Sequence, residues 1–151
     1  MIAVIQRVKH ASVSVDDCKV GECNMGLLIL LGVSVNDTEE DAAVLSRKIL
    51  NLRIFTNEND KLNLSVKDVG GEVLVVSNFT LLANYKKGNR PDYLNSARPE
   101  TAETLYEYFV DLLSKEVVRV EKGAFGEHMI IDMSGDGPIT LVLDSKVLLN
   151  K

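Results

Sequence analysis

Apolar and polar residues alternate along much of the chain, with the period of two that is typical of strands with one buried face. The run from Gly26 to Val35 is instead apolar at almost every position, which is typical of a strand buried on both faces. Polar residues at 9–10 and 16–17 indicate a short connection and a turn. Together these patterns predict strands at residues 2–8, 11–15, 19–23, 26–35, 52–55, 72–77, 117–120, 128–133 and 139–143, of which 72–77 best fits a central strand.

Two segments carry the spacing of amphipathic helices. The first begins after Asp37, where capping and acidic residues suit the helix N-terminus, and its apolar positions continue to Ile49. The second begins near Pro99, whose fixed φ suits the first helical position, and its apolar stripe continues to Leu112. Because few strand-helix-strand crossovers are present, we predict an α+β fold. Curled, barrel-like β-sheets would be flanked by two main helices in a single domain covering residues 1–151.

Length and composition exclude several classes of protein. The chain has 151 residues, 46% hydrophobic and 26% charged, which is the composition of an ordinary globular domain. Its longest apolar run is far shorter than the ~20 residues that cross a membrane, and its first residues do not resemble a signal peptide. Cys18 and Cys23 do not make a disulfide framework. We therefore expect a cytoplasmic protein without a membrane partner.

Charge is distributed unevenly along the chain. The net charge of −5 argues against nonspecific coating of nucleic acid, and DNA is not an expected partner. The segment 85–98 nevertheless has four cations against one carboxylate, a local charge of +3 that leaves −8 for the remainder. It is either a local contact for a phosphate backbone or a solvated surface loop. Its charged residues are Lys86, Lys87, Arg90, Arg98 and Asp92.

Conventional catalytic motifs such as HExxH, GxSxG or a phosphate-binding P-loop are absent from the sequence. His10 and His128 have no sequence-linked carboxylate or nucleophile, which favours structural or exposed roles for both. Cys18 and Cys23 lack a second pair of ligands, so no metal site is predicted.

Two polar segments stand out where apolar strands begin or end. Residues 77–80 follow the strand 72–77, and their hydrogen-bonding side chains either cap a turn locally or line a pocket. Residues 134–140 combine two glycines with a proline just before a predicted strand. Since X–Pro bonds in folded proteins are cis in only ~5–6% of cases, composition alone favours a plain turn with a trans bond.

These segments are part of a longer resemblance. The chain resembles the D-aminoacyl-tRNA deacylases, which hydrolyse the ester between a mischarged D-amino acid and tRNA, and the resemblance runs essentially end to end. Two positions depart from the family's pattern: Asn78 replaces a Gln that is one methylene longer, and Gly135 replaces an Asn. The matching segments are Ala3–Val8, Ala11–Val13, Arg47–Phe55, Val69–Glu72, Ser77–Leu81, Phe125–Gly126 and Asp136–Thr140.

The resemblance implies a hydrolase that acts on ester bonds as a homodimer, without a metal or other cofactor. Each active site would lie at the subunit interface, where a cis peptide between Gly137 and Pro138 reaches into the partner's pocket. Arg7 would hold that segment, and Phe125 and Met129 would border the terminal adenosine of the tRNA. The implied catalytic residues are Thr80 and Phe79; the implied substrate-binding residues are Ser77, Asn78, Phe125, Met129, Gly137, Pro138 and Arg7.

The chemistry that the resemblance implies needs no protein base. An aminoacyl ester is already activated, so the enzyme mainly positions it and stabilises an oxyanion, here through backbone N–H groups around Phe79 and Thr80. The 2′-hydroxyl of the terminal ribose would assist attack by water, with Thr80 as nucleophile the alternative. Main-chain carbonyls of Gly137–Pro138 would bind the α-amino group and exclude L side chains, so glycyl-tRNA would also be accepted.

Other functions stay open on the residues alone. One is a noncatalytic RNA- or protein-binding dimer, and another is a small-ester hydrolase that uses Thr80 or Ser77 with His128. For the deacylase, the expected partner is aminoacyl-tRNA, through its terminal adenosine and acceptor end. Candidate phosphate contacts are Lys86, Lys87 and Arg90.

Overall fold

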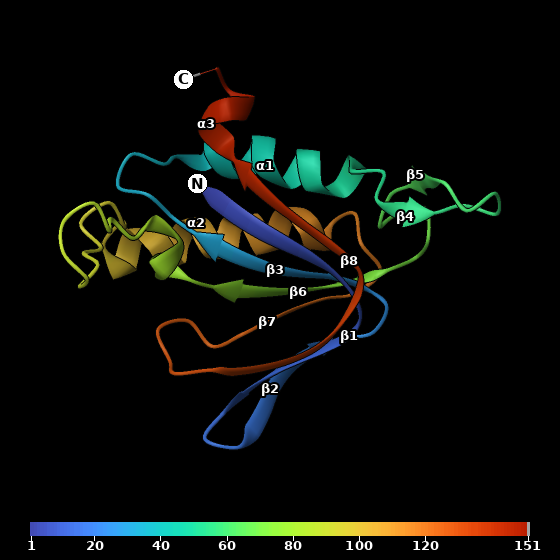
Figure 1. Cartoon of the computed structure of the whole chain (residues 1–151), viewed down its shortest axis with the longest axis horizontal. Helices are drawn as coiled ribbons and strands as arrows, with labels where there is room; N and C mark the ends of the chain where they lie inside the picture. The colour runs from blue at the N-terminus through green and yellow to red at the C-terminus, as the bar shows by residue number, and fades with distance from the viewer. Residues whose placement is uncertain (151) are drawn as a thin grey trace.

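A strongly curved sheet of six strands forms the centre of the structure, a computed structural model that describes residues 1–150 (Figure 1). The strand order is β2-β1-β3-β6-β7, and β8 pairs with the other edge of β1. The β3–β6 and β6–β7 pairs are parallel, whereas β1 is antiparallel to each of its partners. The bounds are β1 Ile2–Val15, β2 Cys18–Cys23, β3 Gly26–Gly32, β6 Glu72–Ser77, β7 Val120–Lys122 and β8 Ile130–Asp144; β4 Phe55–Thr56 and β5 Leu62–Leu64 form a separate small sheet.

The sheet curls until its two ends, β2 and β7, almost meet. The backbone N–H of Glu22 donates to the Glu121 carboxylate over 2.7 Å, and Arg119 forms ion pairs with both glutamates. The backbones approach so closely that a Cβ added at Gly21 would lie 2.5 Å from the Lys122 carbonyl oxygen. These contacts confirm the predicted α+β fold with a barrel-like sheet.

Two main helices cover one face of this sheet. In α1 (Glu39–Asn51), Thr38 and Asp41 form a capping box, and α2 (Pro99–Ser114) begins at its predicted proline. Their buried residues pack on the helix-facing side chains of β3 and β6, including Ile29 and Val75. Two short helices, η1 (Phe79–Leu82) and α3 (Ser145–Leu148), were not predicted. In the part of the chain that the structure describes, no helix combines the length and apolar character needed to cross a membrane.

A second apolar cluster fills the inside of the curl. Leu28 of β3 and Leu74 and Val76 of β6 pack there against residues of β1 and β2. Because successive side chains of a strand point to opposite faces, β3 and β6 contribute to both clusters. This explains why both strands are apolar at consecutive positions.

Several predicted boundaries were wrong. Residues 2–8 and 11–15 form the single strand β1, and residues 130–144 form the single strand β8, so the plain turn predicted near Gly137 lies inside a strand. The pairing register of β1 with β8 shifts twice between Gln6 and His10. These two irregularities accommodate the unpaired residues, and the two strands remain paired on both sides of them. Three other strands are shorter than predicted. The strand predicted at 26–35 ends at Gly32, and the strand predicted at 52–55 is reduced to β4. The strand predicted at 117–120 begins only at Val120.

Candidate active site

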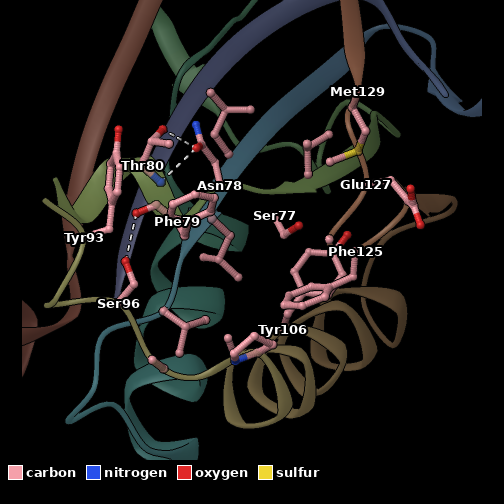
Figure 2. A pocket seen from close by; sticks show the side chains of 18 of the residues that line it. Ser77, Asn78, Phe79, Thr80, Tyr93, Ser96, Tyr106, Phe125, Glu127 and Met129 are labelled. Atoms are coloured by element: carbon pink, nitrogen blue, oxygen red, sulfur yellow. Dashed lines mark hydrogen bonds between the residues drawn. The ribbon is translucent and has the colours of Figure 1, made fainter. Parts of the chain in front are cut away.

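A cavity of about 780 Å³ opens beyond the carboxyl ends of the parallel strands β3 and β6 (Figure 2). Such strand ends are a common place for ligand sites in sheets with parallel strands. Its walls come from η1, from the start of α2 with the loop before it, and from the segment between β7 and β8. Apolar and aromatic side chains dominate the lining, with a few polar groups near η1, which is typical of a small-molecule site.

The cavity brings together six of the site residues expected from the sequence, namely Ser77, Asn78, Phe79, Thr80, Phe125 and Met129. Gly137, Pro138 and Arg7 do not line the cavity of their own chain. Lys86, Lys87 and Arg90 lie outside it on an exposed loop. Lining residues that the sequence analysis did not propose include Tyr93, Ser96 and Tyr106.

Asn78 organises the polar end of the cavity. It follows the last residue of β6 and caps η1, and its Oδ1 accepts hydrogen bonds from the Thr80 N–H (3.2 Å) and the Thr80 hydroxyl (2.5 Å) (Figure 2). The only hydroxyl proton of Thr80 is therefore directed at Asn78. The backbone N–H of Phe79 has no hydrogen-bond partner within residues 1–150. Of the two N–H groups expected to stabilise an oxyanion, Phe79's is free and Thr80's is engaged.

Phe79 joins this end of the cavity to the loop before α2. Its ring, 58% exposed, meets Tyr93 edge-on with 5.0 Å between ring centroids. The Ser96 hydroxyl donates to the Phe79 carbonyl oxygen over 3.1 Å (Figure 2). These two contacts hold η1 and the loop together.

Aromatic rings form the opposite wall, where Tyr106 and Phe125 pack with centroids 5.7 Å apart (Figure 2). The Tyr106 hydroxyl donates to the Val75 carbonyl oxygen over 2.8 Å. Burial, assisted by the nearby Glu107 carboxylate, raises the pKa of Tyr106 well above its usual range. Tyr106 therefore stays neutral and serves as wall rather than as an acid or base.

Among the residues that the structure describes, no histidine or carboxylate is hydrogen-bonded to Ser77 or Thr80 at the cavity. His128 lines it, but within the described residues His128 makes no hydrogen bond or ion pair with Ser77 or Thr80. Glu127, a carboxylate that also lines the cavity, has its side chain directed away from residues 77–80 (Figure 2). Within residues 1–150, no group of three His, Cys, Asp or Glu side chains is arranged to hold a metal ion.

The Gly137–Pro138 segment lies on the exposed side of β8, and its peptide bond is cis. Arg7, which is buried, donates from Nε to the Asp136 carbonyl oxygen (3.2 Å) and from Nη1 to the Ile54 carbonyl oxygen (2.8 Å). It also forms an ion pair with the Asp136 carboxylate at 3.3 Å. Arg7 thus ties the residue before Gly137 to the body of the protein.

Comparison with known proteins extends this description. The model of the D-Tyr-tRNA(Tyr) deacylase family matches residues 4–144. The chain belongs to this family. A relative from Caldicellulosiruptor saccharolyticus named D-aminoacyl-tRNA deacylase is 56% identical over 146 residues, which cover 97% of this chain and 98% of the relative. Another of that name, from Clostridioides difficile, is 51% identical over 145 residues, covering 96% and 97%.

Solved structures show the same fold as this family member. The c-Myc DNA unwinding element binding protein superposes with a TM-score of 0.90 at 39% identity, over 95% of this chain and 98% of that one. A probable eukaryotic D-amino acid tRNA deacylase superposes with a TM-score of 0.82 over the same shares, but at 16% identity it shows similarity of fold alone.

Proposed function

We propose that the protein hydrolyses the ester bond of D-aminoacyl-tRNA and releases a free D-amino acid and tRNA. The observation that carries the proposal is the cavity beyond β6, which is lined by residues 77–80 and by an aromatic wall, and in which the N–H of the lining residue Phe79 has no partner within residues 1–150. The chain belongs to the D-Tyr-tRNA(Tyr) deacylase family, and this membership supports the assignment of the activity to the cavity. Phe125 and Met129 would border the terminal adenosine, and the ester would lie next to η1.

The chemistry proposed for this site is positioning together with oxyanion stabilisation. The Phe79 N–H would donate to the oxygen that becomes negative as water attacks the ester carbonyl. Thr80 is poorly suited to act as nucleophile, because its proton is donated to an amide oxygen that is too weakly basic to remove it. We therefore favour the 2′-hydroxyl of the terminal ribose as the group that assists the water, and an acceptor role for the Thr80 hydroxyl oxygen.

The proposal includes a homodimer formed through β8. Within residues 1–150 this strand pairs with β1 alone, which leaves an open edge, and it exposes Ile130, Met133 and Val142. Ile131 of the same strand lines the cavity, so a second copy seated on β8 would be adjacent to the site. Gly137 and Pro138, which lie outside their own cavity, would then reach the partner's cavity. Sedimentation showing a fully active 16.6 kDa species at micromolar concentration would contradict this arrangement.

Selection for D-amino acids would follow from the backbone of Gly137–Pro138. Its carbonyl oxygens would accept hydrogen bonds from the α-amino group of the substrate, and an L side chain in the same pose would collide with that backbone. Glycine has no side chain to exclude, so glycyl-tRNA would also be hydrolysed. Recognition by the main chain explains strict chirality without a preference among side chains.

The decisive experiment compares hydrolysis of D-tyrosyl-tRNA, L-tyrosyl-tRNA and a free D-tyrosine ester by the purified protein. We expect rapid release from the D-tyrosyl-tRNA alone. Comparable rates on the two enantiomers would exclude proofreading of chirality. Activity only on the free ester would point to a small-ester hydrolase, and binding of tRNA without any hydrolysis would point to a noncatalytic RNA-binding protein.

A further inference from the structure

The loop between η1 and α2 exposes large apolar side chains that do not contribute to the core. Tyr85 is 78% exposed and Leu94 is 83% exposed. Aromatic residues make up only 5% of the chain, yet two of its four tyrosines, Tyr85 and Tyr93, are on this loop. Within residues 1–150, the Tyr85 ring packs on no other ring and its hydroxyl has no hydrogen-bond partner. Its exposure therefore has no explanation within the folded chain.

The cations of the same loop are also without partners. Lys86, Lys87 and Arg90 are exposed, and their side chains form no ion pair with any residue that the structure describes. Some surface lysines elsewhere pair with nearby carboxylates, as Lys19 does with Glu22 and Lys122 does with Glu107, whereas the single lysines at 9, 48 and 61 do not pair within residues 1–150. The loop thus has unpaired positive charge on a chain whose net charge is −5.

The loop is held in place next to the cavity. Its base is closed by two backbone hydrogen bonds between Asn84 and Asp92, of 2.8 and 3.0 Å, and by a bond of 3.0 Å between their side chains. Tyr93 follows this base and contacts Phe79 in the cavity wall. In Figure 1 the loop, coloured yellow-green, projects at the same end of the sheet as the segment between β7 and β8. The loop that has the exposed ring and the cations is thus anchored through Tyr93 to the wall of the cavity.

We infer that this loop binds the unpaired nucleotides that precede the terminal adenosine of the tRNA, with Tyr85 stacking on a base and Lys86, Lys87 and Arg90 contacting phosphates. The inference rests on the proposed function, which places the terminal adenosine in the cavity. Aromatic rings interleaved with unpaired cations are suited to single strands, because an unpaired base offers its face for stacking while a base in a duplex does not. The cations alone would serve either form of RNA, so the single-strand assignment depends on Tyr85.

The first test is kinetic and uses Tyr85→Ala and Tyr85→Phe. We expect Tyr85→Ala to raise KM for D-tyrosyl-tRNA about tenfold with little change in kcat, as for loss of one stacking contact. Tyr85→Phe keeps the ring and should restore KM. The effect should be missing with D-tyrosyl-adenosine, which lacks the preceding nucleotides. Val118→Ala, which alters a 76% exposed residue just before β7, is the matched control.

The second test measures binding without catalysis. A short single-stranded RNA with 2-aminopurine just before its terminal adenosine should lose fluorescence on binding to the wild type and to Tyr85→Phe, but much less with Tyr85→Ala. An unchanged KM and unchanged quenching in Tyr85→Ala would overturn the inference, as would an equal rise of KM on D-tyrosyl-adenosine. If the wild type hydrolyses neither substrate, the proposed function fails, while ring-dependent quenching would still support the binding surface.

Discussion

Replacing Asn78 by Ala tests how the polar end of the site is organised. Asn78 Oδ1 accepts both the N–H and the hydroxyl of Thr80, so Asn78→Ala removes two hydrogen bonds at once. The cap of η1 is lost, the Thr80 hydroxyl can rotate, and the Thr80 N–H has no protein acceptor. The substitution therefore changes the position of Thr80 without altering Thr80 itself.

The expected magnitude follows from those two bonds. Each hydrogen bond contributes about 0.5–1.5 kcal/mol of net free energy. Because both residues are at least partly exposed, values in the lower half of this range are expected, which gives about 1–2 kcal/mol for the two bonds. If that free energy holds Thr80 in its productive position, kcat should fall about 5- to 30-fold. The lost cap, typically about 1 kcal/mol, should lower the melting temperature by about 2–4 °C in a chain of this size.

The assay measures kcat and KM for D-tyrosyl-tRNA together with thermal melting. Asn78→Asp separates the two effects, because its carboxylate still accepts both hydrogen bonds and should preserve the melting temperature. Its negative charge, beside the place where the proposed mechanism puts the oxyanion, should nevertheless reduce kcat. Asn59→Ala, an exposed asparagine in the turn between β4 and β5, is the matched control. An Asn78→Ala protein with unchanged kcat and unchanged melting would refute the assignment of Asn78 as the residue that positions Thr80.

Three further predictions concern the catalytic group, the Gly137 backbone and stability in acid. Thr80→Ala should lower kcat by less than about tenfold, whereas a tRNA ending in 2′-deoxyadenosine should be almost inert. If a deacylation assay gives the reverse ranking, Thr80 rather than the 2′-hydroxyl of the tRNA is the group that assists hydrolysis. Gly137→Ala should abolish D-aminoacyl-tRNA hydrolysis while sedimentation still shows a dimer, because Gly137 has a φ of +127° and a Cβ there would lie 2.7 Å from the Ile139 nitrogen. Burial raises the pKa of Asp41, but hydrogen bonds from Lys146, Ser145 and the Thr38 N–H outweigh it and hold that pKa well below its usual range. The resulting stability is present above about pH 4 and decreases as the pH falls, so urea unfolding of Asp41→Asn should change less between pH 5 and pH 3 than that of the wild type.

Local patterns predicted the elements whose ends are marked by local chemistry. The strand β6 has the bounds that its apolar run indicated, and α2 begins at Pro99, where the proline leaves no N–H to satisfy. The long strands β1 and β8 were divided in two by prediction, because polar residues and glycines in their middles resemble turns. In the structure, pairing over distant residues, such as Val8 with Gly135, overrides these local signals.

The site could likewise be predicted only where local sequence marks it. Residues 77–80 stood out because polar side chains follow a buried strand. Tyr93, Ser96 and Tyr106 carry no such signal, since only tertiary packing brings a loop and a helix against η1. Tyr106 lies on the same face of α2 as Ala102 of the predicted stripe, and its hydroxyl bond to Val75 is visible only once the sheet is formed.

The two interpretations of residues 77–80, a local cap or a pocket wall, turn out to be compatible. Asn78 caps the turn locally through its hydrogen bonds to Thr80, while Ser77, Phe79 and Thr80 line the cavity. The resemblance described from the sequence implies Gln at this position, and asparagine is among the best capping residues because its short side chain reaches the N–H two residues on. Gln, with one more methylene, is not suited to that short bridge. Asn78 therefore has a local physical consequence: in this chain the N–H of Thr80 is satisfied from within the loop, so of the two N–H groups in the proposed mechanism that of Phe79 is the one without a partner in residues 1–150.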